Sequence, residues 1–470
     1  MQSYKIYLAG HFTETSQKLD VANPHTAEIF AQTFLASAEE LETAIKRAES
    51  VKEELKNMPS HKRYGILMQI AEEIKNQREH LASVLCKESA KPMRYALGEI
   101  DRAAQTFVVA AEESRRLPKE YISLDWTPPG EGKEGIVKYF PIGLVAGIAP
   151  FNFPMNLAVH KIAPAIASGC PIILKPASAT PLSMLELAKI IDKTVLPKGA
   201  VSILPMDRKT GNQLVTDERF KLLSFTGSPV VGWEMKKNAG KKKTILELGG
   251  NAAVIVTESA ELATAIPKCV TSGFAYSGQI CIHAQRFFVQ ENIFETFTQQ
   301  FVEAAKKLKQ GDPANTETDI AQMIDEENAK RVEEWINEAI REGAKILCGG
   351  TRNGNYVAPS VLTNTSVKMK ICSQEAFGPV VVIERYNTFD DAVSMVNDSA
   401  FGLQGGVFTN NAAEIDKAFN EIDAGGVIIN DAPTFRVDHM PYGGVKDSGL
   451  GREGVKYAIM DMMEARILVK

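Results

Sequence analysis

The stretch GLVAGIAPFNFPMNLAVHKIAPAIASGCPIILKPAS, residues 143–178, decides the fold. It contains a short apolar run at 143–150, a pattern with helical spacing at 156–168 and a second apolar run at 171–177. Short apolar strands that alternate with helices are typical of parallel sheets covered by helices on both faces. The stretch therefore predicts a βαβ unit of a doubly wound α/β domain.

The same alternation continues on the C-terminal side of this unit. Further strands are expected at 201–206, 221–228 and 244–250, with helices at 182–193, near 209–216 and at 229–240. A second alternating block follows, with expected strands at 251–257, 285–290, 344–350, 380–386, 405–409 and 425–430. We therefore predict two α/β domains in one chain, the second over residues 247–440.

Segments outside these blocks have other patterns. Residues 37–117 read as mostly helical, and Ser37 with Glu40 forms a capping-box pattern at their start. Residues 118–140 are rich in Pro and Gly before they become strand-like, which predicts an extended hairpin. Residues 461–470 are expected to form a closing strand.

Composition argues against several classes of protein. The 470 residues are 44% hydrophobic and 24% charged, and a formal net charge of −5 does not point to nucleic acid or to a membrane surface. The N-terminus lacks a signal-peptide pattern, and no apolar run reaches the roughly 20 residues that span a bilayer. The six cysteines form no CxxC pair, which argues against a disulfide framework or a zinc module. We expect a cytoplasmic protein without a metal site.

Four groups of residues follow predicted strands, where ligands bind in doubly wound sheets. They are residues 150–154 (PFNFP), 174–178 (LKPAS), 225–228 (FTGS) with Gly232, and 246–251 (LELGGN). The carboxyl ends of parallel strands meet at one edge of the sheet, so these groups are expected to converge. Cys281, in the sequence GQIC, lies about thirty residues beyond the last group.

Together these motifs resemble the aldehyde dehydrogenase family. The matching sequences are FNFP, LKPAS, FTGS with Gly232, ELGGN, GQIC, EAFGP at 375–379 and YGGVKDSG at 442–449, in the family's order and over nearly the whole chain. The resemblance implies a doubly wound parallel-sheet cofactor domain (1–117 and 141–246), a second α/β catalytic domain (247–440) and a small oligomerisation hairpin or arm (118–140 and 455–470). It also implies a homodimer or homotetramer.

The resemblance implies that Cys281 is a nucleophile that adds to an aldehyde. A thiolate can form a thiohemiacetal, which expels hydride and leaves a thioester. The Asn152 side chain and the backbone N–H of Cys281 would bind the oxyanion, and Glu247 would be the base for the hydrolytic water. Without the resemblance, plainer interpretations compete: a core cysteine, an Asx turn and a structural ion pair.

Glu453, in GLGREG, has two interpretations. It matches a second glutamate that the family sometimes uses in proton relay. The interpretation we favour is a surface carboxylate in the first turn of a helix, where the helix dipole stabilises negative charge.

The cofactor site is also implied by the resemblance, because no GxGxxG sequence follows a strand. The implied residues are Ile148, Pro150, Phe151, Lys175, Ser178, Gly227, Ser228, Gly232, Leu248, Glu375 and Phe377. Ser228 and the first helical amides would meet the pyrophosphate, Lys175 the adenosine ribose, and Glu375 with Phe377 the nicotinamide ribose. Many NAD-specific relatives have glutamate where Ser178 stands, and serine does not repel a 2′-phosphate. We therefore expect NADP to be preferred over NAD, with loop geometry as the alternative determinant.

The substrate pocket is expected at the loop 432–436, APTFR. Arg436 would bind a substrate anion, with Arg102 and His160 as further candidates, and each has the alternative of a structural pairing. The string at 434–454 resembles a branch with lactaldehyde, sulfolactaldehyde, phosphonoacetaldehyde and non-phosphorylating glyceraldehyde-3-phosphate dehydrogenases. Ala275 and His160 depart from the arginines of some succinate-semialdehyde enzymes.

The expected function is NAD(P)-dependent oxidation of a small aldehyde, uncharged or anionic, to its carboxylic acid. Lactaldehyde, succinate semialdehyde, phosphonoacetaldehyde and glyceraldehyde 3-phosphate are the candidate substrates. Two alternatives stay open. Acyl transfer to coenzyme A is disfavoured by Glu247, and a catalytically silent relative is disfavoured by the intact Cys281, Glu247 and Asn152.

Overall fold

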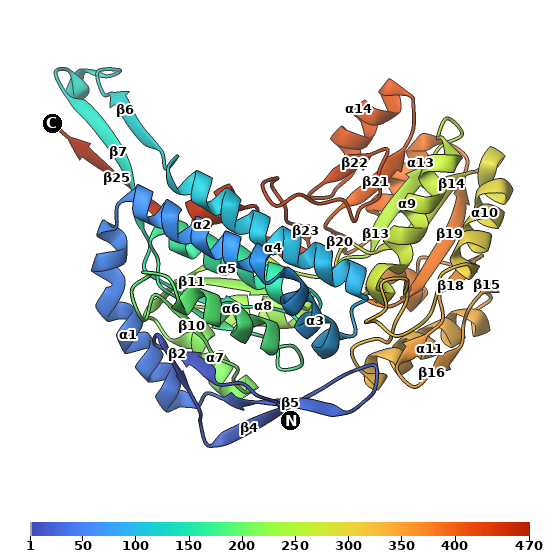
Figure 1. Cartoon of the computed structure of the whole chain (residues 1–470). Helices are drawn as coiled ribbons and strands as arrows, with labels where there is room; N and C mark the ends of the chain where they lie inside the picture. The colour runs from blue at the N-terminus through green and yellow to red at the C-terminus, as the bar shows by residue number, and fades with distance from the viewer. Residues whose placement is uncertain (1) are drawn as a thin grey trace.

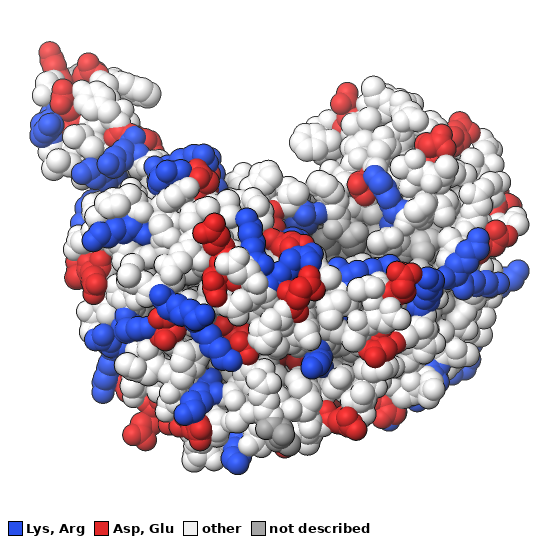
Figure 2. Space-filling view, viewed as in Figure 1, with Lys and Arg blue, Asp and Glu red and all other residues white. Residues whose placement is uncertain are grey.

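The computed structural model describes residues 2–470, which form two α/β bodies and a projecting arm (Figure 1). The predicted fold class is confirmed, because each body contains a mixed, mainly parallel sheet. Acidic and basic side chains are intermixed over the face seen in Figure 2, and the surface is hollowed between the two bodies. No helix within residues 2–470 is long and apolar enough to cross a membrane.

The first sheet has eight strands in the order β24-β12-β11-β8-β9-β10-β2-β3. Their bounds are β2 Ile6–Leu8, β3 His11–Thr13, β8 Leu144–Ile148, β9 Ile172–Lys175, β10 Val201–Ile203, β11 Phe220–Thr226, β12 Lys243–Glu247 and β24 Gly449–Leu450. The five central strands are parallel and are the five predicted from the sequence. β24 is added antiparallel at one edge, and β2 followed by β3 is added antiparallel at the other.

Helices connect these parallel strands and cover both faces of the sheet. They are α5 Pro154–Ser168, α6 Leu182–Asp192, α7 Arg208–Thr216 and α8 Pro229–Asn238, with α1 Ala38–Asn57, α2 Ser60–Asn76, α3 Arg78–Ser89 and α4 Met93–Ser114 from the predicted helical segment. On β9, Ile172 and Leu174 join the core beneath α2 and α4–α6, whereas Ile173 joins the core beneath α1. Alternate residues of a strand point to opposite faces, so these strands need apolar residues throughout.

The strand order reverses between β8 and β11. The chain adds β9 and then β10 on one side of β8, and it adds β11 and then β12 on the other. The loops after β8 and β11 therefore diverge and leave a crevice at the carboxyl ends of the strands. The first sheet thus places a ligand site where the sequence groups were expected to converge.

The second body is built around a seven-stranded sheet in the order β15-β18-β19-β14-β13-β21-β22. The strands are β13 Ala252–Val256, β14 Ala284–Gln290, β15 Lys345–Cys348, β18 Ser360–Thr363, β19 Val380–Tyr386, β21 Gly405–Phe408 and β22 Val427–Ile429. The helices are α9 Leu262–Phe274, α10 Phe294–Lys306, α11 Glu326–Arg341, α12 Lys370–Ser373, α13 Phe389–Asn397 and α14 Ala412–Glu421. Because β12 ends at Glu247 and β13 begins at Ala252, residues 248–251 link the two sheets.

The arm is a three-stranded antiparallel sheet in the order β25-β7-β6. It contains β6 Lys119–Ser123 and β7 Glu134–Pro141 of the predicted hairpin and the predicted closing strand β25 Met463–Val469 (Figure 1). Of the segment 455–470, only β25 lies in this sheet, since α15 Val455–Asp461 packs against α4 and α5.

Several short strands were not expected from the sequence. β1 Gln2–Ser3, β4 Gln17–Ala22 and β5 Ile29–Leu35 form a three-stranded sheet near the N-terminus, below both bodies in Figure 1. Two further pairs are β16 Arg352–Asn353 with β17 Tyr356–Val357 and β20 Phe401–Gly402 with β23 Val445–Lys446. The two-residue strands carry too little alternation to be recognised in a sequence. β4 and β5 have six and seven residues, but most of these residues are exposed or only partly buried, so their apolar alternation is weak.

Candidate active site

A cleft at the β8/β11 crevice gathers most of the residues that the sequence singled out. The sequence-predicted residues that line it are Ile148, Pro150, Phe151, Asn152, Lys175, Gly227, Ser228, Glu247, Leu248, Cys281, Glu375 and Phe377. Ser178 is exposed beyond this lining, and Gly232 lies behind it on α8. A Cβ atom on Gly232 would overlap the Leu248 side chain, so glycine permits the close packing of α8.

Cys281 is half-buried between the 3-10 turn Ala275–Gly278 and β14. Its Sγ lies 3.2 Å from the hydroxyl of Tyr442. Burial raises the pKa of the thiol to about 11, while the Tyr442 hydrogen bond and the charge of Arg436 act in the opposite direction. This cysteine needs help from its surroundings to ionise, because the thiolate is the reactive form.

The backbone before Cys281 is strained. Tyr276 and Ser277 have φ values of 49° and 53°, in the left-handed region that non-glycine residues seldom adopt. Two buried hydrogen bonds hold them there, from the Tyr276 hydroxyl to the Ser89 carbonyl at 3.1 Å and from Ser277 Oγ to the Ala321 carbonyl at 2.7 Å. Such strain persists only where surrounding contacts hold the backbone firmly, and here those contacts fix the loop that carries Cys281.

Asn152 lies on the short loop between β8 and α5 and is buried. Its Nδ2 donates one hydrogen bond to the carbonyl of Gln279 at 3.0 Å. An amide nitrogen carries two protons, so a second donor remains for another acceptor. The Glu99 carboxylate fixes this loop, because it accepts hydrogen bonds from the Met155 and Asn156 amides at 2.9 and 3.1 Å and pairs with Lys91.

Glu247 ends β12 and is buried, with neither carboxylate oxygen hydrogen-bonded within residues 2–470. Burial and the nearby charge of Glu453 raise its pKa well above the ordinary value. An unpaired buried carboxylate is costly in its charged form, so the group stays neutral until a proton acceptor or cation reaches it. The alternative interpretation of Glu247 as a member of a structural ion pair is therefore not supported, because no such pair forms within the described residues.

The two glycines after Glu247 allow the second body to approach closely. A Cβ atom on Gly249 would overlap the Glu375 carboxylate, and one on Gly250 would lie 2.7 Å from the Cys281 carbonyl oxygen. The Gly250 amide donates to Glu375 Oε1 at 3.0 Å. Burial raises the pKa of Glu375 to about 7, and its second oxygen stays available toward the cleft.

On the other side of the cysteine, Arg436, His160 and Arg102 come together, but around carboxylates that the sequence analysis did not assign. Arg102 donates to Asp438 Oδ1 at 2.7 Å, and His160 Nε2 lies 2.8 Å from the same oxygen. Arg436 Nη2 donates to Glu453 at 3.0 Å. Two buried polar atoms here lack a hydrogen-bond partner, Arg436 Nε and His160 Nδ1.

The expectation that Glu453 is a surface carboxylate is wrong. Glu453 is 2% exposed and pairs with Lys161 at 3.1 Å and with Arg436. Burial opposes its ionisation, but Lys161, His160 and Arg436 together lower its pKa to about 2. The cause is β24, which pairs with the end of β12 and brings the following residues beside Glu247.

Sequence reasoning also missed Tyr442, Asp438 and Lys161. Asp438 accepts hydrogen bonds from three side chains, and the cations and His160 around it lower its pKa despite burial. Tyr442 and Asp438 belong to the segment 434–454 that carried the family resemblance. The resemblance therefore pointed to this segment, but the sequence did not indicate that these two side chains point toward the site. Lys161 was hidden because it reads as one more polar residue of a helix.

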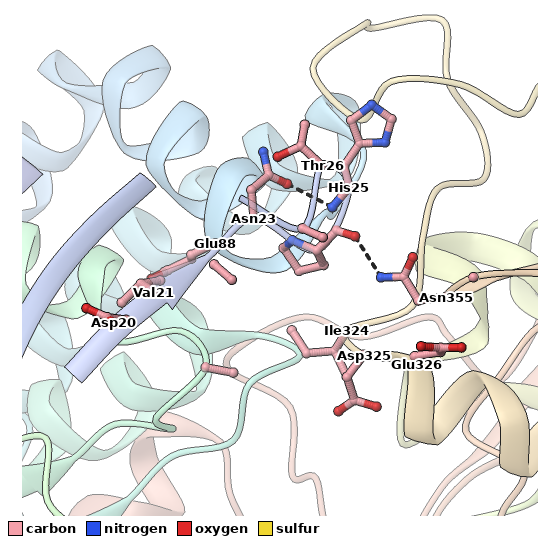
Figure 3. A pocket seen from close by; sticks show the side chains of 15 residues that line it. Asp20, Val21, Asn23, His25, Thr26, Glu88, Ile324, Asp325, Glu326 and Asn355 are labelled. Atoms are coloured by element: carbon pink, nitrogen blue, oxygen red, sulfur yellow. Dashed lines mark hydrogen bonds between the residues drawn. The ribbon is translucent and has the colours of Figure 1, made fainter. Parts of the chain in front are cut away.

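A second pocket lies between the N-terminal sheet and the start of α11 (Figure 3). Asn355 Nδ2 donates to the carbonyl of Pro24 at 2.6 Å at this place. Glu88 reaches the pocket wall, but its carboxylate caps α6 by accepting from the Leu182 and Ser183 amides at 2.6 and 3.0 Å. None of the predicted site residues lines this pocket, and no metal-binding group of His, Cys, Asp or Glu forms within residues 2–470.

Comparison with known proteins gives consistent matches over the full length. A sequence model described as "Aldehyde dehydrogenase family" matches residues 12–468. The 3-sulfolactaldehyde dehydrogenase of Priestia aryabhattai is 42% identical over 471 residues, covering 100% of this chain and 98% of that protein. Aldehyde dehydrogenase 21 of Physcomitrella patens, solved with the reaction product succinate, is 44% identical with a TM-score of 0.99 and covers 100% and 98% of the two chains. The glyceraldehyde-3-phosphate dehydrogenase GapN of Methanocaldococcus jannaschii, solved with NADP, is 39% identical with a TM-score of 0.93 and covers 97% and 100%.

Proposed function

Because the chain belongs to the aldehyde dehydrogenase family, we propose that it oxidises a small aldehyde to its carboxylic acid with NAD(P). The observation that carries the proposal is the meeting of Cys281, Asn152 and Glu247 at one edge of the first sheet. A nucleophile, an oxyanion donor and a base for water are the groups that this reaction requires of the protein.

The first step is addition of the Cys281 thiolate, formed when the thiol loses its proton to solvent, to the carbonyl carbon. A C–S bond forms, the C=O π bond breaks, and the negative charge passes to the carbonyl oxygen. One N–H of the Asn152 side-chain amide is bonded to Gln279, and the other N–H, together with the backbone N–H of Cys281, stabilises that oxyanion. Since Asn152 is buried and already held by Gln279, its donor needs little reorganisation.

Bound NAD(P) supplies the acceptor for the hydride that leaves this carbon. The resulting Cys281 thioester is hydrolysed by water, from which the ionised form of Glu247, after loss of its own proton to solvent, removes a proton. Its raised pKa suits this role, because a carboxylate tuned toward neutrality is a stronger base than an ordinary one. Collapse of the second tetrahedral intermediate breaks the C–S bond and releases the acid, and the Cys281 thiolate that leaves takes the proton held by Glu247 and becomes the thiol again.

The cleft fits a dinucleotide. Ser228 is the N-cap of α8 but makes no capping hydrogen bond with its side chain, and Pro229 has no N–H, so the amides of Val230 and Val231 are open to an anion such as the pyrophosphate. Glu375 retains one oxygen for a ribose hydroxyl. Phe377 packs edge-on against Phe151 with ring centroids 5.9 Å apart, and its φ of 46° turns it into the cleft.

We propose that NADP is preferred over NAD. Lys175 ends β9 at the cleft, and Ser178 is exposed and uncharged three residues later. The acid near Lys175 is Asp207, whose carboxylate already accepts from the Thr210 amide at 2.7 Å as the N-cap of α7. A 2′-phosphate would therefore meet a lysine without a glutamate beside it.

The substrate proposal rests on the charges around Arg436. The three cations Arg102, Arg436 and Lys161 face the two carboxylates of Asp438 and Glu453. The cluster therefore has one more positive than negative charge, and this net charge suits a substrate with a monoanionic or uncharged tail better than one with a dianionic tail. Arg436 Nε is a buried donor without a partner and would bind the anion.

We expect a different role for His160 than donation to an anion. The carboxylate of Asp438 can only accept, so His160 Nε2 carries the proton of that hydrogen bond. Burial and the charge of Arg436 lower the pKa of His160, which keeps the ring neutral. Nδ1 then has a lone pair, and this suits the 2-hydroxyl of lactaldehyde or of a related hydroxyaldehyde.

The test is a kinetic panel of lactaldehyde, sulfolactaldehyde, succinate semialdehyde, phosphonoacetaldehyde and glyceraldehyde 3-phosphate, each with NAD and NADP. Cys281→Ala should abolish turnover of every substrate, and turnover that survives refutes the covalent mechanism. An acyl-CoA product formed on addition of coenzyme A would favour acyl transfer over hydrolysis. No reduction of either nicotinamide with any aldehyde would favour the catalytically silent alternative.

We also propose that the arm of β6, β7 and β25 holds subunits together in a homodimer or homotetramer. We likewise propose the division of the chain expected from the sequence, with a cofactor domain over 1–117 and 141–246 and a catalytic domain over 247–440. The arm projects from the first body, and Tyr121, Trp126 and Leu468 on it are 65%, 89% and 58% exposed (Figure 1). Exposed apolar residues on unpaired strand edges invite pairing with another chain. Sedimentation of the full chain as a monomer would reject this assignment.

A further inference from the structure

Tyr442 contacts the reacting sulfur directly. Its hydroxyl lies 3.2 Å from Cys281 Sγ, and the side chain is 2% exposed. The backbone of Tyr442 is fixed by reciprocal hydrogen bonds with Glu453, of which the one from the Tyr442 amide is 3.0 Å long. The guanidinium of Arg436 stacks on the ring, with Cζ 3.7 Å from the ring centroid. The hydroxyl is therefore held at the sulfur by the backbone, by packing and by a cation.

The direction of this hydrogen bond follows from the charge on sulfur. A neutral thiol can donate or accept, whereas a thiolate has no proton to give. Burial raises the pKa of the Tyr442 phenol well above its ordinary value, so the phenol keeps its proton. When Cys281 ionises, Tyr442 is thus the donor, and a hydrogen bond to an ionised acceptor is the strong kind.

We propose that Tyr442 is a further residue of the catalytic site, whose hydroxyl stabilises the Cys281 thiolate and fixes Sγ before it attacks the carbonyl carbon. The inference rests on the proposed role of Cys281 as the nucleophile. When the C–S bond forms, the charge moves from sulfur to the carbonyl oxygen, where Asn152 receives it. Tyr442 then faces a neutral thioether sulfur, and its hydrogen bond weakens as the Asn152 hydrogen bond strengthens.

The other charged groups around Cys281 show why this hydroxyl matters. Burial opposes ionisation most strongly, and Glu375 and Glu247 act in the same direction when they are ionised. Arg436 and the Tyr442 hydrogen bond are the groups that favour the thiolate. Arg436 also stacks on Tyr442 and pairs with Glu453, so removal of only the tyrosine oxygen leaves the cation in place.

The experiment is the pH dependence of Cys281 alkylation by iodoacetamide in the full-length enzyme without aldehyde, for the wild type and for Tyr442→Phe. Loss of the hydroxyl should raise the apparent pKa of Cys281 by about one or more. The thiolate fraction then falls about tenfold, but the more basic thiolate is about threefold more reactive, so alkylation near neutral pH slows about threefold. Mass spectrometry assigns the modified residue.

Tyr386→Phe is the matched control, because Tyr386 is a buried tyrosine of β19 whose hydroxyl donates to the Val256 carbonyl and does not contact Cys281 or its loop. Its alkylation profile should keep the wild-type pKa. Replacement of Tyr442 by 3-fluorotyrosine, a more acidic phenol and stronger donor, should lower the Cys281 pKa, and it provides a test if the phenylalanine variant does not fold. An unchanged pKa in the Tyr442 variants, or equal changes in Tyr386→Phe, would overturn the inference.

This test is independent of turnover. Alkylation needs no aldehyde, so a chain without dehydrogenase activity still reports on the hydrogen bond between Tyr442 and Cys281. Conversely, turnover in Cys281→Ala would refute the proposed function while the alkylation profile stayed as expected. The two failures are therefore distinguishable.

Discussion

Replacing Glu247 by glutamine should separate the two halves of the reaction. The glutamine side chain keeps the size and shape of the glutamate but cannot take a proton from water. Loss of a general base costs about 10²–10⁴ in rate, which corresponds to about 3–5 kcal/mol in the barrier to hydrolysis of the thioester. Addition and hydride loss do not use this base, so the first turnover of NAD(P)H should persist as a burst followed by a slow steady state.

The same substitution should change how stability depends on pH. In the folded wild type, burial and Glu453 raise the pKa of Glu247 well above the value of 4.5 for an ordinary glutamate. Above that pH the native state holds a proton that the unfolded state has lost, so the free energy of unfolding falls as pH rises. The loss is at most about 1.4 kcal/mol per pH unit, until the folded pKa is reached. Glutamine does not titrate, and Glu247→Gln should gain stability relative to the wild type as pH increases.

Stopped-flow measurement of nicotinamide reduction and scanning calorimetry at several pH values check the two parts. Glu375, whose pKa is raised to about 7, also makes stability depend on pH. It does so equally in the wild type and in Glu247→Gln, so its effect cancels when their free energies of unfolding are subtracted. Wild-type steady-state turnover in Glu247→Gln would refute the assignment of the base. A stability difference that does not vary with pH would show that Glu247 is charged in the folded enzyme.

The remaining predictions concern Asn152, Ser178 and Arg436. Asn152→Ala should lower kcat/KM about 10²–10³-fold because an oxyanion donor is lost, while iodoacetamide alkylation of Cys281 keeps its rate; equal loss in both assays would contradict the role. Ser178→Glu should lower the ratio of kcat/KM for NADP over NAD at least about tenfold, since a carboxylate would repel the 2′-phosphate, and an unchanged ratio would assign the preference to loop geometry. Arg436→Ala should lower kcat/KM for succinate semialdehyde at least about tenfold more than for lactaldehyde, and parallel losses would exclude an anion site.

The sequence predicted the regular parts of this molecule because they depend on local patterns. Residues 143–178 contain two continuous apolar runs, at β8 and β9, separated by a segment with helical spacing, so the strands and the helix between them were expected in the right order. Topology then brought FNFP, FTGS and ELGGN to one edge by the general geometry of doubly wound sheets. The positions of these three motifs could therefore be predicted without information on contacts between distant parts of the chain.

The segment from Asn430 to Gly454 shows what a local pattern cannot predict. It contains only the two-residue strands β23 and β24, so no periodicity indicates which side chains point inward. The burial of Glu453 and the contacts of Tyr442 and Asp438 follow from the pairing of β24 with β12, which lies about two hundred residues earlier in the chain. A charged residue before a helix looks the same in a sequence whether it faces water or an arginine.

The short link between the two sheets has a mechanical consequence. Residues 248–251 join β12 to β13, with Glu247 at one end and the Cys281 carbonyl packed against Gly250. If the two bodies rotate relative to each other about this link, each atom is displaced in proportion to its distance from the axis. The mouth of the cleft would then move far while the base and the nucleophile, close to the pivot, keep their separation. A long dinucleotide could enter and leave such an enzyme without disturbing the alignment of the reacting groups.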